Sequence, residues 1–428
     1  MPRRKNQGWR KLGSLAAKLT FSLTFTVLLL EIGLRVMGLR PITRTVEYHD
    51  PLLLHPEPFV AEAQRNGWLH WPRETRRVDG IREHARGYID IRTNNVSCRE
   101  DADTGIEKQP GTIRILVLGD SHTDGVCFND ESYPNLLEQE WNRVAGDDRF
   151  EIINAGFGPS SPYQQLWAFQ QVYSRFRPDH LVVAWYAGND LVELLRTDER
   201  VHLKRDGDRF VHEAPTRATD DTRTKPSAWG TLKAGLRDHL SLYHALVQIR
   251  GLRKLVRSAE ADEYRERLEQ AILENPGVVW QGMNQSYYFT HHAEAFPQAM
   301  QMMDHILHEY RRYAEEQGIG FTLLVIPTLR QIHPDSDAAS LKKIQETLEL
   351  SDADLQWDEK VCDALVALGR SEGVLTIDLR EVLRKSRADS PQDAFYYQFD
   401  HHLNVAGNRV IARALEAALV GKFESQRD

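Results

Sequence analysis

Residues 112–122 read TIRILVL followed by GDSH, an apolar run that passes directly into a short polar turn. Apolar and β-branched residues fill positions 112–118 almost without interruption, which is typical of a strand buried on both faces of a parallel sheet. Because the turn follows at once, Ser121 is expected at the carboxyl end of this strand. Ligands of parallel α/β sheets bind beyond these ends. The stretch therefore predicts both a fold class and the neighbourhood of a site.

Four other short apolar runs repeat this pattern further along the chain. They cover residues 150–153 (FEII), 181–186 (LVVAWY), 321–326 (FTLLVI) and 374–379 (VLTIDL). Helical patterns lie between them, over residues 133–144, 163–176, 299–317 and 358–371. Strands that alternate with helices predict an α/β fold, with a central parallel sheet of about five strands and helices on both faces.

Two of these runs end in polar motifs of the same kind. NAG follows the run FEII at residues 154–156, and GND follows LVVAWY at residues 188–190. A further motif, DHHLN, stands near the C-terminus at residues 400–404. Because parallel strands share one carboxyl edge, Ser121, Gly156 and Asn189 are expected to lie close together.

These residue types are the ones that acyl transfer through a serine requires. A serine hydroxyl is a weak nucleophile until a base removes its proton. We predict Ser121 as the nucleophile, His402 as the base and Asp400 as the carboxylate that holds the imidazole in the productive tautomer. The tetrahedral oxyanion needs preorganised donors. The predicted donors are the backbone N–H groups of Ser121 and Gly156 and the side-chain amide of Asn189.

Each motif taken alone has a second interpretation. GDS and GND are good turn sequences, and Asn404 is a good N-cap for a helix over residues 405–420. His401 is the competing base, although its position beside His402 favours contact with solvent or a structural hydrogen bond. The order of the motifs, and the place of two of them at strand ends, favour the catalytic interpretation.

Length, charge and cysteine content limit the number of domains and the kinds of partner. The 428 residues allow one large domain with insertions, or two domains. A net charge of -8 argues against a nucleic-acid partner, because phosphate-binding proteins carry a basic excess. No Cys/His spacing predicts zinc, so we expect no metal site. Cys98 and Cys127 bracket the first predicted strand. Either these two cysteines form a disulfide, or all three cysteines, Cys362 included, are free thiols.

The N-terminus has a charge pattern of its own. The first eighteen residues hold six basic side chains and no acidic one, and residues 19–30 (LTFSLTFTVLLL) are uncharged. This pattern predicts a signal-anchor helix within residues 1–39 that spans the cytoplasmic membrane, with the chain from about residue 40 on its outer side. A cleaved signal peptide and a buried helix of the domain are the alternatives, although no A-x-A-like cleavage site follows.

The remaining chain divides into three parts. Residues 40–110 are polar and rich in arginine, and we interpret them as a lead-in on the domain surface. Residues 111–428 form the main domain. Residues 196–298 interrupt the strand–helix alternation, and we expect a helical insertion there that either caps the site or forms a solvated excursion.

The motifs resemble the sequence blocks of the SGNH (GDSL-like) hydrolases. GDS resembles the nucleophile block, NAG the glycine block, GND the asparagine block, and DHHLNVAG at residues 400–407 the last block. The similarity covers about residues 112–420 without the insertion. It implies a flavodoxin-like three-layer α/β/α sandwich, a Ser-His-Asp triad, and ester hydrolysis or acyl transfer without a cofactor.

Two positions depart from the commonest family pattern. Position 399 is Phe, so Asp400 lies two residues before His402 instead of three; this form resembles membrane-anchored and periplasmic members, including those related to alginate O-acetylation proteins. His122 stands where many members have an apolar residue, and the sequence assigns it no role.

The leading hypothesis is an extracytoplasmic esterase or transferase that acts on acyl groups, acetyl above all, of an envelope carbohydrate. An anchored lipase or lysophospholipase is the alternative enzyme, with a lipid ester as substrate. A polysaccharide-binding component without turnover is the non-enzymatic alternative. The acyl group, its acceptor and the oligomeric state stay open.

Overall fold

The computed structural model describes residues 5–37, 44–46, 74–79, 84–158, 160–195, 202–207, 209–213, 240–242, 284–334, 345, 349–397 and 401–427. Its centre is a five-stranded sheet in which every neighbouring pair is parallel. In chain order the strands are β4 (Ile113–Leu118), β5 (Phe150–Asn154), β6 (His180–Tyr186), β9 (Gly320–Ile326) and β10 (Leu375–Asp378). The predicted parallel sheet of about five strands is confirmed.

The order of these strands across the sheet is β10-β9-β6-β4-β5. Numbered by their sequence in the chain, this is the order 2-1-3-4-5 of flavodoxin-like sheets, in which ligands bind where the winding reverses, between the first and third strands. Those two strands are β4 and β6, and the register pairs Leu116 with Leu181. The switch point therefore lies directly below residues 119–122 and 187–190.

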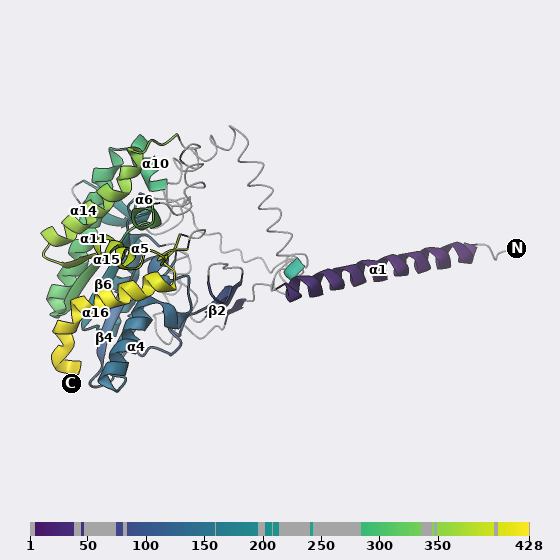
Figure 1. Cartoon of the computed structure of the whole chain (residues 1–428), viewed down its shortest axis with the longest axis horizontal. Coiled ribbons are helices and arrows are strands. Elements are labelled where there is room, and N and C mark those ends of the chain that lie inside the picture. The colour runs from purple at the N-terminus through teal and green to yellow at the C-terminus, as the bar shows by residue number, and fades with distance from the viewer. Residues whose placement is uncertain are drawn as a thin grey trace.

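Helices cover both faces of the sheet and complete three layers (Figure 1). One face packs against α4 (Tyr133–Ala145), α15 (Leu379–Asp389) and α16 (Val405–Arg427). The other face packs against α5 (Pro162–Gln171), α11 (Ala295–Gln317) and α14 (Trp357–Ser371). Strand β4 shows why the layers form, because Leu116 joins one core and the next residue, Val117, joins the other. Burial of each such side chain contributes about 1.5–3 kcal/mol.

The insertion after β6 differs from the expectation drawn from the sequence. The described part of the insertion begins with a β-hairpin, β7 (His202–Asp206) and β8 (Arg209–Glu213), which the expectation of a helical insertion did not include. Apart from residues 240–242, residues 214–283 lie outside the described residues. The described part of the insertion ends with α10 (Asn284–His291).

The lead-in contains a three-stranded antiparallel sheet of β1 (Arg44–Val46), β2 (Glu74–Asp79) and β3 (Tyr88–Arg92). Its last part does not lie on the domain surface as expected. Cys98 and Arg99 are both completely buried, so residues near position 99 belong to the interior of the α/β domain. The divisions at residues 39 and 110 stay predictions.

The N-terminal helix α1 (Lys5–Val36) projects away from the α/β domain (Figure 1). Within the described ranges, no helix combines the length and the hydropathy that crossing a membrane requires. The membrane-spanning helix expected within residues 1–39 is therefore not supported. Lys18, Glu31 and Arg35 confine the uncharged run to residues 19–30, which is shorter than the ~20 apolar residues of a typical span.

The three cysteines are free and buried. The structure therefore contradicts a disulfide between Cys98 and Cys127 and agrees with the alternative of three free thiols. Burial raises the pKa of the Cys127 thiol to about 12. The thiol of Cys362 is also kept neutral by burial, which raises its pKa. These side chains act as small apolar groups of the core.

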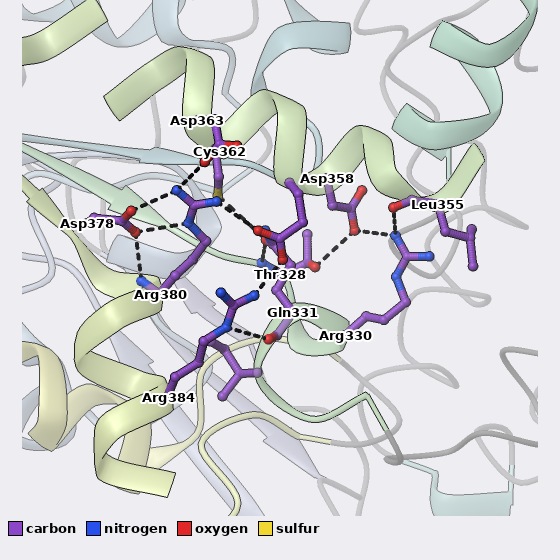
Figure 2. A network of polar contacts seen from close by, with 12 residues as sticks. Thr328, Arg330, Gln331, Leu355, Asp358, Cys362, Asp363, Asp378, Arg380 and Arg384 are labelled. Atoms are coloured by element: carbon purple, nitrogen blue, oxygen red, sulfur yellow. Dashed lines mark hydrogen bonds and ion pairs between the residues drawn. The ribbon is translucent and has the colours of Figure 1, made fainter. Parts of the chain in front are cut away.

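A polar network braces the β9–β10 edge of the sheet (Figure 2). Asp358 of α14 accepts hydrogen bonds from Thr328 Oγ1 at 3.0 Å and from Arg330 Nη2 at 2.6 Å. Ser286 of α10 donates to the other oxygen of Asp358 at 3.1 Å. Next to it, the Nη2 atom of Arg380 lies 2.7 Å from the Oδ2 atom of Asp378, which ends β10. The network fixes the end of the insertion to the carboxyl end of β9.

Candidate active site

The serine stands where the first apolar run predicted it. Helix α3 (Ser121–Asp124) begins directly after β4, and the Asp120 side chain caps it by accepting a hydrogen bond from the His122 N–H at 2.9 Å. Gly119 is required in this turn, because a Cβ atom there would lie 2.8 Å from the Cβ atom of Thr123. The strand, the turn and the cap together fix the first residue of the helix at the edge of the sheet.

The histidine reaches this serine from the far end of the chain. The Nε2 atom of His402 lies 2.8 Å from the Oγ atom of Ser121, across 281 positions of sequence. The turn that carries it is closed by two backbone hydrogen bonds, from Tyr397 N to His402 O and from His401 N to Tyr397 O, each 2.9 Å long. His401 has a φ of 66°, a left-handed conformation that non-glycine residues adopt at a cost. Asp400 lies outside the described residues, so its role stays a prediction.

The asparagine stands at the end of the neighbouring strand. Asn189 is the N-cap of α6 (Asp190–Glu193), directly after β6, and it is 8% exposed. Its Nδ2 atom donates to the Oε1 atom of Glu193 at 2.8 Å, which fixes the orientation of the amide. An amide nitrogen has two N–H groups. One of them is therefore left for a ligand above the switch point.

The glycine prediction needs revision. The N–H group of Gly156 donates to the Asn154 side chain at 3.1 Å, and a Cβ atom at Gly156 would lie 2.5 Å from the backbone nitrogen of Asp124. This glycine packs against the back of α3. A Cβ atom at Gly158 would lie 3.7 Å from the Cβ atom of Ser121. Gly158 is thus the glycine that borders the serine, and the second glycine of the stretch NAGFG was the signal for it.

Two carboxyl groups are buried below the serine. Burial raises the pKa of Asp120 to about 6, although its bond from the His122 N–H and the charge of His402 act in the opposite direction. Burial also raises the pKa of Asp190 well above its usual range, and the nearby charges of Asp120 and Glu193 raise it further. Asp190 accepts a hydrogen bond from Tyr186 N at 2.8 Å and so closes the turn after β6.

The lead-in supports the site from behind. Arg99 is completely buried and donates to the carbonyl oxygen of Cys127 at 2.7 Å and to Asp124 at 3.4 Å. The carboxylate of Glu100 accepts from Asn154 N at 2.7 Å. Burial and the charge of Glu138 raise the pKa of Glu100 well above its usual range. Sequence reasoning missed these residues because charged side chains predict a surface position.

His122 is a further residue to which the sequence assigned no role. It is buried, with ring centroids 3.9 Å from Tyr186 and 4.8 Å from His402. Among the described residues, no group of three or more histidine, cysteine, aspartate or glutamate side chains forms a candidate metal site. The described polar groups of this edge include the Ser121 hydroxyl, the His402 imidazole and the Asn189 amide.

Residues 282–427 match the family described as "SGNH hydrolase-like domain, acetyltransferase AlgX". Residues 282–427 are therefore similar to an SGNH hydrolase-like domain. The matched part includes His402 and begins after Ser121. The predicted resemblance to the SGNH hydrolases is confirmed, and so is the predicted enzyme class, an ester-acting hydrolase or acyltransferase. No curated protein sequence matches the chain.

The solved structures that match the chain are distant from it in sequence. The acetyl xylan esterase AlAXEase shares 14% identity over 72% of this chain and 100% of its own, with a TM-score of 0.37. A catalytic mutant of an acetylxylan esterase from Geobacillus stearothermophilus shares 11% identity over 73% of this chain and 96% of its own, with a TM-score of 0.33. The lipase/acylhydrolase from Enterococcus faecalis shares 14% identity over 73% and 97%, with a TM-score of 0.34.

Proposed function

We propose that the chain hydrolyses or transfers acyl groups, acetyl above all, at ester bonds of an acylated carbohydrate. The observation that carries the proposal is the 2.8 Å contact between the Nε2 atom of His402 and the Oγ atom of Ser121 at the carboxyl edge of the sheet. A serine needs a base within hydrogen-bond reach to become a nucleophile. The family matched by residues 282–427 is described as an acetyltransferase, which supports the acetyl group.

The reaction follows from this contact. His402 Nε2 accepts the hydroxyl proton while the Oγ atom of Ser121 bonds to the ester carbonyl carbon, and the carbonyl electron pair moves onto oxygen. When the tetrahedral intermediate collapses, the carbohydrate oxygen leaves and takes the proton from Nε2. Ser121 is then acylated. Water or a second sugar hydroxyl attacks the acyl group, passes its proton through Nε2, and restores the serine.

The oxyanion of the intermediate needs donors in fixed positions. We assign this role to the backbone N–H group of Ser121 and to the N–H of Asn189 that does not contact Glu193. Gly156 is left out of the assignment because its N–H already donates to Asn154. Asp400 is proposed to hold the other ring nitrogen of His402, as its position two residues earlier suggests.

We test this function with the full chain and three substrates: an acetylated xylo-oligosaccharide, p-nitrophenyl acetate, and a long-chain p-nitrophenyl ester. Acetate release from the first two, lost in Ser121→Ala and retained in the matched control Ser371→Ala, is the expected result. An unacetylated oligosaccharide added as acceptor separates transfer from hydrolysis, because transfer yields an acetylated product. Activity on the long-chain ester alone contradicts a carbohydrate substrate and favours a lipase.

We also propose that the α/β domain acts outside the cytoplasmic membrane. The six basic residues among the first eighteen, followed by the uncharged residues 19–30, support this location. An alkaline phosphatase fused to the C-terminus of the full chain is expected to be active, because that enzyme matures only outside the cytoplasm. Activity of a cytoplasmic reporter at the same position, with an inactive phosphatase, contradicts the location.

A further inference from the structure

His122 follows the proposed nucleophile in the chain and lies within a stack of aromatic rings. Its ring centroid is 3.9 Å from Tyr186, with planes 34° apart, and 4.8 Å from His402, with planes 35° apart. Tyr396 approaches from a third side, edge-on, at 6.2 Å. Tyr186 ends β6, Tyr396 precedes the turn of His402, and His122 belongs to α3. The stack therefore joins three separate segments at the proposed base.

His122 is held by packing. The side chain is 3% exposed, and its Nδ1 atom is buried without a hydrogen-bond partner among the described residues. The neighbouring Asp120 carboxylate contacts the backbone N–H of His122. Ring contacts thus fix the plane of the imidazole, which makes it a rigid surface against one side of the His402 ring.

His122 stays neutral while His402 takes up a proton. Burial lowers the pKa of His122 well below its usual range, and the charge of His402 lowers it further. Among the described residues, Tyr186, Tyr396 and Asp120 are the other titratable groups near His122. Burial raises the pKa of both phenols, so both are neutral, and Asp120 is the nearest described carboxyl group, with Asp190 beyond it. The ring beside His402 is consequently a π-face and not a second cation.

A neutral aromatic ring in this position has two effects on a catalytic imidazole. It restricts rotation of the His402 ring, so that the Nε2 atom stays 2.8 Å from the Ser121 hydroxyl. It also stabilises the imidazolium that forms during acyl transfer, since the centroid distance of 4.8 Å lies within the ~6 Å range of cation–π contacts. An aliphatic side chain at position 122 fills space but supplies no π-face.

We propose that His122 is a positioning residue whose neutral ring orients His402 and stabilises its protonated form. The inference rests on the proposed acyl-transfer function of Ser121 and His402. It concerns a position where many SGNH hydrolases carry an apolar residue, and so it is a feature of this chain. His122 itself exchanges no proton with the substrate.

The test compares three variants of the full chain in acetyl-ester hydrolysis. His122→Phe keeps a flat ring and is expected to retain kcat within about threefold, with an unchanged acidic limb of the pH profile. His122→Leu and His122→Gln lose the ring; their kcat is expected to fall about 3- to 30-fold with little change in KM, and the acidic limb shifts to lower pH because the imidazolium is less stable. His305→Leu, which removes a histidine–aromatic contact with Phe210 far from the serine, is the control and is expected to match the wild type.

Each outcome decides the inference. Wild-type kcat and pH profile in both ring-less variants overturn it, and so does a loss in His122→Phe equal to that in His122→Leu. If the ring-less variants fail to fold, NMR of the His402 ring protons in wild type and His122→Phe decides instead: a ring-current shift present in both supports stacking, and its absence contradicts it. An inactive wild type refutes the proposed function itself, which separates the two failures.

Discussion

The amide of Asn189 offers the sharpest test of how the site stabilises charge. In Asn189→Ala both N–H donors are lost, while the serine–histidine contact is left in place. Removal of one oxyanion donor typically lowers kcat about 10²–10³-fold, or about 2.7–4 kcal/mol of transition-state stabilisation. Because the donor acts on the oxyanion and not on the ground-state ester, KM is expected to change little. Steady-state hydrolysis of p-nitrophenyl acetate by the full chain measures both constants.

Glu193 provides the matched pair of variants for this amide. Glu193→Gln keeps an oxygen that accepts from the Asn189 Nδ2 atom, so kcat is expected within about threefold of the wild type. Glu193→Ala leaves the amide without its 2.8 Å partner, and a buried unpaired donor costs about 1–3 kcal/mol, so kcat is expected about 10-fold lower and the variant less stable. Asn189→Ala with kcat within threefold of the wild type would refute the assigned donor. Equal kcat in Glu193→Gln and Glu193→Ala would refute the role of Glu193.

Five further variants, at four positions, test the backbone geometry and one buried carboxyl group. Gly156→Ala is expected to lower the free energy of unfolding by about 1–3 kcal/mol in urea titration, since its Cβ atom meets the Asp124 backbone; Gly158→Ala, whose Cβ atom would make only ordinary contacts, is expected to be destabilised less, and equal destabilisation of the two variants would contradict this. His401→Gly is expected to keep activity and stability, whereas His401→Val is destabilised by about 1–2 kcal/mol because of its positive φ; equal stabilities in thermal melts would refute this. Burial raises the pKa of Glu138 to about 7 from 4.5. The folded protein therefore binds more protons than the unfolded chain, and the stability of the wild type falls as the pH rises from about 4.5 to 7. Glu138→Gln is expected to remove up to about 3 kcal/mol of this fall, and identical pH profiles of stability in the two proteins would contradict this expectation.

The sheet could be predicted from the sequence because four of its five strands, β4, β5, β6 and β9, are largely buried on both faces. Each of the five apolar runs, from residues 112–118 to residues 374–379, coincides with a strand to within one or two residues. The strand ends then placed Ser121 and Asn189 beside the switch point. Burial on both faces gives short, nearly continuous apolar runs, and their length and the turn residues that follow them distinguish these strands from buried helices.

The rest of the site depends on contacts between segments that are distant in the sequence. The stretch NAGFG contains two glycines, and its spacing does not tell which one borders the serine; the backbone of α3 decides this. Arg99 and Glu100 look like surface residues until Cys127 O and Asn154 N provide their partners. The ring stack on His122 forms only when β6, which carries Tyr186, and the turn that carries His402 lie next to each other in the fold.

The N-terminal helix makes a contact that its charge pattern did not predict. Basic residues followed by an uncharged run predicted a spanning helix, and Glu31 is the acidic residue that ends this run. In the structure this carboxylate accepts hydrogen bonds from the backbone of Ser241 and Leu242, each 2.9 Å long, and from Arg35 at 2.8 Å. These bonds lower the pKa of Glu31 to about 2 although burial acts in the opposite direction. A partner more than two hundred positions away cannot be seen in a local window.

The measurement that tests the central claim most directly is labelling of the full chain with a fluorophosphonate probe, followed by mass-spectrometric mapping of the adduct. We expect a single adduct on Ser121, absent in Ser121→Ala, slowed in His402→Ala and unchanged in His401→Ala and Ser371→Ala. An adduct on another serine, or a folded chain that is not labelled at all, would contradict an activated nucleophile at the end of β4.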